Sequence, residues 1–231
     1  DIVDWHRAKY DPPEGMLTAI MAEQADPETT LAENELVDET VLFMTAGQET
    51  TALTLTYAFY WLSRNPAAAQ RLREEATAVL DGARPGWDDL PELNYTEKVV
   101  RETLRLTPAA WNVPRETREP VTLAGTSLDA GELLIMSPYA HHRDRWAWDA
   151  PKAFRPERWG GSASRGQDSY FPFGSGPRVC IGRQIALTEA QFALAHLLQH
   201  YDIKTDTGRL NFRPGVTLRP DADIAATVEA R

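Results

Sequence analysis

The chain has 231 residues, a formal net charge of −10 at pH 7 and a hydrophobic residue content of 42%. These values indicate a globular protein with a real core, and the negative charge argues against a nucleic-acid-binding protein. The single cysteine, Cys180, excludes a disulfide framework and favours a cytoplasmic location, and no apolar run reaches the roughly 18 residues of a membrane-spanning helix.

Two helices are predicted first along the chain. Residues 14–25 have apolar side chains on one side and read as a short helix. Thr30 and Glu33 fit a capping box, so a second helix is expected from Glu33 to Arg64. Its 32 residues would span roughly 48 Å. Because it is apolar on most faces after Val41, we expect this helix to cross the core.

The middle of this long helix is polar and contains a glycine. Residues 46–51 read Ala-Gly-Gln-Glu-Thr-Thr, and Gly47 in a helix interior costs about 1 kcal/mol relative to alanine. One interpretation is a close helix crossing at Gly47, with the Thr50 hydroxyl bonded to the previous turn. The other is a wet groove that the carboxylate of Glu49 and the hydroxyls line. The residues alone leave both open.

The next helix is expected to begin at Asn65 and Pro66, as capping and first-turn residues, and to end near Leu80. Residues 87–92 follow, with two adjacent acids and a third three positions later. This pattern faintly resembles a diphosphate–metal motif, but a loop with turn-forming acids is the favoured interpretation. The acidic residues of this segment are Asp88, Asp89 and Glu92.

A further helix is predicted over residues 95–106, where Glu102 and Arg105 lie three apart and share a face. As a surface ion pair they would contribute little stability. After Pro108 the pattern changes to short strands broken by glycines. The expected strands cover residues 121–123, 127–128, 133–135, 216–218 and 224–228.

A glycine- and proline-rich loop over residues 173–182 carries Cys180 to the start of an apolar helix expected from about 181 to 201. The positive end of the helix dipole and free backbone N–H groups would stabilise a thiolate, the form that binds metals. Arg178 is placed to pair with an anionic group of a partner. A buried structural cysteine is the alternative. The expected buried face of the helix comprises Ile181, Ile185, Ala186, Leu194, Leu197 and Leu198.

Charge is distributed unevenly along the chain. Residues 1–100 contain 19 acidic and 7 basic side chains, whereas residues 141–183 contain 8 Lys or Arg and 4 Asp or Glu. The segment that carries Cys180 is therefore expected to be locally basic within an acidic protein.

Four separated segments together resemble the cytochrome P-450 family, in that family's order. They are residues 46–50, the Glu-x-x-Arg of residues 102–105, residues 154–159, and the Phe-x-x-Gly-x-Arg-x-Cys-x-Gly of residues 173–182. Trp159 departs from the pattern, because Phe is commoner there. The resemblance covers essentially the whole chain and matches the family's C-terminal half. It implies a mainly α fold with small β-sheets, with residues 1–231 forming the C-terminal part of one haem-binding domain.

The resemblance also implies a site for haem b. Cys180 would be the axial iron ligand, Arg178 and Arg115 would contact the propionates, and Phe173, Gly174 and Gly182 would pack against the group. Glu49 and Thr50 would deliver protons during oxygen activation. Glu102, Arg105 and Arg158 would form a buried structural triad. Positions that would line the substrate are Ala46, Thr51, Ala110, Trp111, Val113 and Val216.

The implied function is a monooxygenase that inserts one oxygen atom from O2 into a lipophilic small molecule. Electrons would come from a separate ferredoxin or flavoprotein, because neither a flavin nor an iron–sulfur signature is present. A haem-thiolate peroxygenase or isomerase, and a non-catalytic haem-binding fragment, are the alternatives. We also expect the chain to need the family's N-terminal half or another copy of itself, since the recognised segments all belong to the second half.

Overall fold

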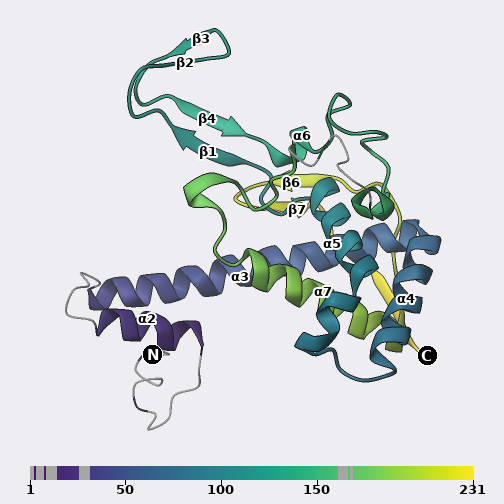
Figure 1. Ribbon diagram of the computed structural model, residues 1–231. Coiled ribbons are helices and arrows are strands. Elements are labelled where there is room, and N and C mark those ends of the chain that lie inside the picture. The colour runs from purple at the N-terminus through teal and green to yellow at the C-terminus, as the bar shows by residue number, and fades with distance from the viewer. Residues whose placement is uncertain (1–2, 4–7, 9–14, 26–31, 161–165, 167–168) are drawn as a thin grey trace. The chain divides into compact units, whose positions relative to one another are not determined.

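The structure, a computed structural model, describes residues 3, 8, 15–25, 32–160, 166 and 169–231 (Figure 1). It divides into two compact units, Asp1–Glu49 and Thr50–Arg231. The predicted capping residue Thr30 lies outside the described residues. No helix of the described ranges is both long enough and apolar enough to cross a membrane.

The first unit contains α2 (Met16–Gln24) and the beginning of α3 (Glu33–Arg64), as the periodicity predicts. Leu36 and Thr40 are buried, and the Thr40 hydroxyl donates to the Leu36 carbonyl oxygen over 2.8 Å. The next apolar residues are exposed, with 55% of Val41 and 57% of Leu42 accessible to solvent. Helix α3 therefore joins the core later than its apolar sequence after Val41 predicts, because buried residues recur only from Thr51 onward.

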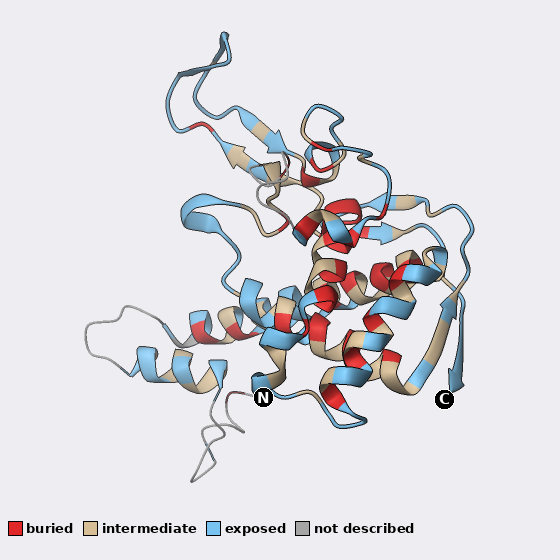
Figure 2. Ribbon diagram, turned by 45° about the vertical axis from the view of Figure 1, so that its right-hand side comes forward, coloured by how far each residue is buried: buried red, intermediate tan, exposed pale blue. Residues whose placement is uncertain are grey.

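The core of the second unit lies between the C-terminal half of α3 and three further helices, α4 (Pro66–Leu80), α5 (Asn94–Leu106) and α7 (Arg183–His200). Each presents apolar side chains at helical spacing to the others (Figure 2). Central members of this core are Leu62, Leu72, Leu80, Val99, Leu104, Leu194 and Leu198.

Helix α4 shows how local sequence sets the ends of an element. Pro66 occupies its first turn, where the missing N–H is not needed. Asn65 is the N-cap residue, as predicted, but its side chain accepts no hydrogen bond from the helix. Its side-chain amide instead donates to the Trp61 carbonyl oxygen of α3 over 2.7 Å. Asp81 then ends α4 in the left-handed region with φ 44°.

Four antiparallel ribbons of two strands each complete the described part of the second unit. In the ribbon of residues 113–116 and 133–136 Arg115 stands opposite Leu134, and the hairpin of residues 121–128 lies at its far end (Figure 1). The predicted strands near 121, 127, 133, 218 and 226 are present, but the strands over 113–116, 201–205 and 212–214 were not expected. The pairs are β1 (Val113–Glu116) with β4 (Leu133–Met136), β2 (Val121–Leu123) with β3 (Thr126–Leu128), β5 (Tyr201–Thr205) with β8 (Ala226–Ala230), and β6 (Phe212–Pro214) with β7 (Leu218–Pro220).

Short helical segments connect these larger elements. Residues expected to form an acidic loop make the 3-10 helix η1 (Trp87–Glu92) instead. The other short segments are α6 (Pro138–His141), η2 (Pro156–Gly160) and η4 (Gly176–Arg178).

Candidate functional site

The loop that carries Cys180 has the tight turns that its glycines predict. Gly174 and Gly176 have φ angles of 74° and 76°, in a region that side chains disfavour. The Cys180 amide donates to the Phe173 carbonyl oxygen over 3.0 Å, which closes the loop upon itself. The thiol is free and exposed, so the alternative of a buried structural cysteine is wrong.

Cys180 lies just before α7, which begins at Arg183 rather than near residue 181. Gly182 is the capping residue and has an ordinary φ of −80°, so its glycine is not required by backbone conformation. Ile181 and Ile185 are 81% and 58% exposed. They do not join the buried face of α7 as expected, because this end of the helix extends beyond the core that covers Leu194 and Leu198.

An exposed thiol with apolar and cationic side chains nearby in the sequence suits a group that carries a metal and anionic substituents. Exposed Val179 and Ile181 flank the thiol in the chain. Among the described residues neither Arg115 nor Arg178 forms an ion pair, so both guanidinium groups are available to an anion. Haem, with its iron and two propionates, is such a group.

Behind this loop, the predicted triad of Glu102, Arg105 and Arg158 is present and buried. The Arg105 and Glu102 side chains have 0% exposure, and Arg105 Nη2 lies 2.8 Å from Glu102 Oε1. Arg105 Nε also donates to Glu102 Oε2 over 2.9 Å, which makes the pair bidentate. Arg158 Nε reaches Glu102 Oε1 over 3.0 Å. Burial lowers the pKa of Arg158, although the Glu102 carboxylate opposes that change.

Further donors complete the hydrogen bonds of the triad. The Arg155 amide donates to Glu102 Oε1 over 2.9 Å, and the indole N–H of Trp159 donates to Oε2 over 3.0 Å. Arg105 also donates to three carbonyl oxygens of the connection between α6 and η2, which fixes this irregular segment against α5. Those carbonyls belong to His142, Pro151 and Ala153.

Aromatic rings connect the triad to the beginning of the Cys180 loop. The rings of Trp159 and Tyr170 lie 4.6 Å apart between centroids. The Tyr170 hydroxyl donates to the Arg101 carbonyl oxygen of α5 over 3.1 Å. Burial raises the pKa of Tyr170 far above its ordinary range, so this hydroxyl remains a donor.

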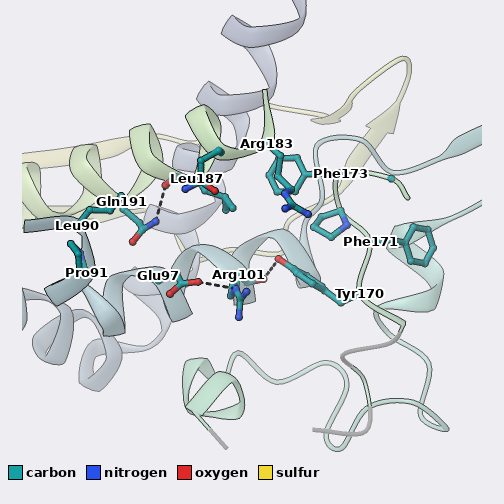
Figure 3. A pocket seen from close by; sticks show the side chains of 13 residues that line it. Leu90, Pro91, Glu97, Arg101, Tyr170, Phe171, Phe173, Arg183, Leu187 and Gln191 are labelled. Atoms are coloured by element: carbon teal, nitrogen blue, oxygen red, sulfur yellow. Dashed lines mark hydrogen bonds and ion pairs between the residues drawn. The ribbon is translucent and has the colours of Figure 1, made fainter. Parts of the chain in front are cut away.

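A cavity of about 440 Å³ borders the beginning of the loop. Figure 3 shows Tyr170, Phe171 and Phe173 at one end and Leu90 and Pro91 at the other. The polar side chains of the lining come from α5 and α7, and they include Glu97, Arg101, Arg183, Gln184 and Gln191.

Two of the segments predicted to line the substrate lie side by side. The Trp111 indole donates to the Gly215 carbonyl oxygen over 2.8 Å, and the Leu218 amide donates to the Ala109 carbonyl oxygen over 2.9 Å. Val216, between these contacts, is 96% exposed. Of the other predicted lining positions, Ala110 and Val113 are half-buried and Thr51 is buried. Ala46 is exposed and belongs to the first unit.

Glu49 and Thr50 lie on α3, at the boundary between the two units. A side chain placed at Gly47 would meet nothing within 4 Å, so the described residues make no close helix crossing there. The Thr50 carbonyl oxygen accepts the Thr54 hydroxyl over 2.8 Å.

The acidic segment of η1 has a local structural role. Asp89 accepts the Gly86 amide over 2.8 Å and so closes the first turn. Across the described part of the chain, no group of three or more His, Cys, Asp or Glu side chains could hold a metal ion. This finding gives no support to a metal–diphosphate site at Asp88, Asp89 and Glu92.

Comparisons with known proteins agree with the geometry. The family model described as Cytochrome P-450 matches residues 3–223. The chain is 36% identical over 226 residues to pentalenene oxygenase of Streptomyces avermitilis, covering 97% of the chain and 47% of the relative. It is 38% identical over 235 residues to cyclooctatin synthase of Streptomyces melanosporofaciens, covering 98% and 49%. The chain therefore spans about half the length of these curated relatives.

Proposed function

Because the chain belongs to the cytochrome P-450 family, we propose that its protein is a haem-thiolate monooxygenase that inserts one oxygen atom from O2 into a lipophilic small molecule. The observation that supports this most directly is the exposed Cys180 thiol. It lies on a loop whose beginning is linked through His142 to the buried Glu102–Arg105 ion pair. A haem-thiolate peroxygenase or isomerase and a non-catalytic haem binder are the alternatives.

Four side chains would hold the haem. Cys180 would ligate the iron, Arg115 and Arg178 would pair with the propionates, and Phe173 would pack close to the sulfur. When bound, a thiolate-ligated haem supplies the chemistry that favours cleavage of the O–O bond. The cofactor in this proposal is haem b, which the resemblance to the family implies.

Glu49 and Thr50 are proposed to move protons to the reacting oxygen. A carboxylate and a hydroxyl adjacent in the chain can pass a proton through one intervening water. The support is their position in the segment that resembles the family's oxygen-activation sequence.

The substrate is proposed to be lipophilic. Trp111 and Val216 come from two segments that hydrogen bonds hold together, and both offer apolar surface. Pentalenene, which appears in the name of one relative, is therefore a suitable first test compound.

The electron donor is proposed to be an acidic ferredoxin or flavoprotein. Arg158 contributes little to the predicted basic surface, because it is buried against Glu102. The remaining basic side chains in residues 141–183 that are exposed include Arg145, Lys152, Arg155 and Arg178. Opposite charges would steer the donor toward the segment that carries the thiol.

The test is the carbon-monoxide difference spectrum of the reduced full-length protein, since this spectrum reports thiolate ligation. The parent protein should show the thiolate form, and Cys180→Ala should abolish both this form and oxygenation of the test substrate. The matched control is Ser175→Ala, an exposed change in the same loop, which should keep the spectrum. A thiolate spectrum that survives in Cys180→Ala would refute the assignment.

A further inference from the structure

We propose that His142 is a positioning residue, which fixes the loop carrying Cys180 to the buried Glu102–Arg105 pair. Its imidazole would do so by accepting a hydrogen bond from the Phe171 amide, while Arg105 donates to the backbone carbonyl oxygen of His142. Its meaning for catalysis rests on the proposed ligation of haem by Cys180, whereas the structural link can be tested without haem.

A continuous series of contacts leads from the triad to the cysteine. Arg105 Nη1 donates to the His142 carbonyl oxygen over 2.6 Å, and the Phe171 amide donates to His142 Nε2 over 3.0 Å. The Phe171 carbonyl oxygen then accepts the Gly174 amide over 3.0 Å. The Phe173 carbonyl oxygen accepts the Cys180 amide over 3.0 Å. The His142 contact therefore fixes Phe171 at the beginning of the loop. The residues that follow, Phe173 and Gly174, carry the hydrogen bonds that close the loop at Cys180.

The contact needs a neutral imidazole whose proton is on Nδ1, because only an unprotonated Nε2 can accept. His142 has 0% exposure. Burial lowers its pKa to about 3, and the positive charges of Arg105 and Arg143 act in the same direction. The ring thus stays an acceptor throughout the neutral range.

The remaining environment of the ring shows that packing alone does not explain a histidine here. Nδ1 is buried and has no hydrogen-bond partner among the described residues. A buried donor without a partner is unfavourable, and an apolar side chain of similar size would avoid it. Such a side chain would instead leave the partly buried amide of Phe171 without its acceptor. The ring itself is fixed by Tyr170, whose centroid is 5.1 Å away, and by Phe171 at 5.3 Å.

Two variants, His142→Gln and His142→Asn, test whether a hydrogen-bond acceptor at the position of Nε2 is required or whether any polar side chain suffices. In His142→Gln the side-chain oxygen reaches about as far as Nε2, whereas in His142→Asn it reaches only as far as Nδ1. We would measure site-resolved hydrogen exchange of the Phe171 and Cys180 amides in the full-length, haem-free protein. The Asn variant should exchange the Phe171 amide roughly tenfold faster than the parent, and the Gln variant should stay within about threefold of the parent.

The control for general loss of stability is Leu72→Ala, a change in the core of α4 that touches none of these contacts. It should lower global stability without selectively accelerating exchange at Phe171. Equal exchange at Phe171 in the Asn and Gln variants would overturn the proposal, and so would selective acceleration in the Leu72→Ala control. If the Asn variant does not fold, a folded Gln variant that loses the protection of Phe171 overturns it as well.

The second readout is the carbon-monoxide difference spectrum of the haem-loaded protein. The Asn variant should convert a larger fraction of the protein to a form without thiolate ligation, and the Gln variant should restore the parent's fraction. The hydrogen exchange of the Phe171 amide could change as expected in the variants while the parent shows no thiolate form. That result would refute the proposed haem function but support the contact between His142 and Phe171. A thiolate fraction that is identical in parent, Asn and Gln variants would show that His142 does not position Cys180.

Discussion

Replacing Glu102 with glutamine should show how much the buried triad stabilises the second unit. Glu102→Gln keeps the shape of the side chain but removes the only carboxylate that faces Arg105 and Arg158 in the described structure. The two side chains are 0% and 7% exposed, so water cannot replace the lost charge. The amide nitrogen would also direct N–H groups at donors that now bond to an oxygen.

The magnitude follows from the five hydrogen bonds that the carboxylate accepts. Three come from guanidinium groups, one from the Arg155 amide and one from the Trp159 indole. Breaking a buried ion pair by removing one partner costs roughly 3–5 kcal/mol. Typical domains have a free energy of unfolding of about 5–15 kcal/mol, so the variant should lose a large fraction of its stability.

Urea unfolding, followed by far-UV circular dichroism, measures this loss as a change in the free energy of unfolding. The matched control is Glu157→Gln, the same chemical change in the pair that Glu157 forms with Arg71 at 2.7 Å. These two side chains are 53% and 55% exposed, so the control should cost less than about 1 kcal/mol. Equal losses in the two variants would refute the inference that burial gives the triad its importance.

Three further predictions concern proton supply, electron supply and pH. Thr50→Ala should leave substrate affinity nearly constant, but less product should form per electron consumed and more hydrogen peroxide should appear; unchanged stoichiometry would contradict the relay. Reduction by an acidic ferredoxin should slow as ionic strength rises, and a rate insensitive to salt would contradict the basic surface. The pKa of His142 is lowered from 6.5 to about 3, so below pH 6.5 the unfolded chain binds a proton that the folded chain does not. Stability should therefore fall as pH drops from 6.5 toward 3, by up to about 1.4 kcal/mol per pH unit, and pH-dependent urea unfolding should show a shallower slope for His142→Gln.

The sequence predicts the long helices best, because their apolar periodicity extends over several turns. Helices α3, α4 and α5 have bounds within two residues of those expected. The triad was also predictable, since the spacing of Glu102 and Arg105 matches a known pattern and Arg158 lies in a second one. Their burial was implied by the family resemblance, whereas the spacing of Glu102 and Arg105 alone fits a surface ion pair equally well.

Short strands and local exposure could not be predicted in the same way. Strands β1, β5 and β6 have only three to five residues, and their pairing partners fix them. Ile181 and Ile185 have the apolar character of core residues but lie where α7 extends beyond its neighbours. The role of His142 had no sequence signal, because it depends on a backbone amide 29 positions away.

Trp159, which departs from the family pattern, adds a hydrogen bond to the buried triad of Glu102, Arg105 and Arg158. Phenylalanine at this position could pack against Tyr170 but could not donate to Glu102, whereas the Trp159 indole does both. The carboxylate thereby gains a fifth donor, at Oε2, whereas Arg158 donates to Oε1. Directional contacts of this kind fix one geometry, while apolar packing alone tolerates small shifts. The residues behind the loop can therefore hold it in one position, and the side chains around Cys180 remain exposed to receive a ligand.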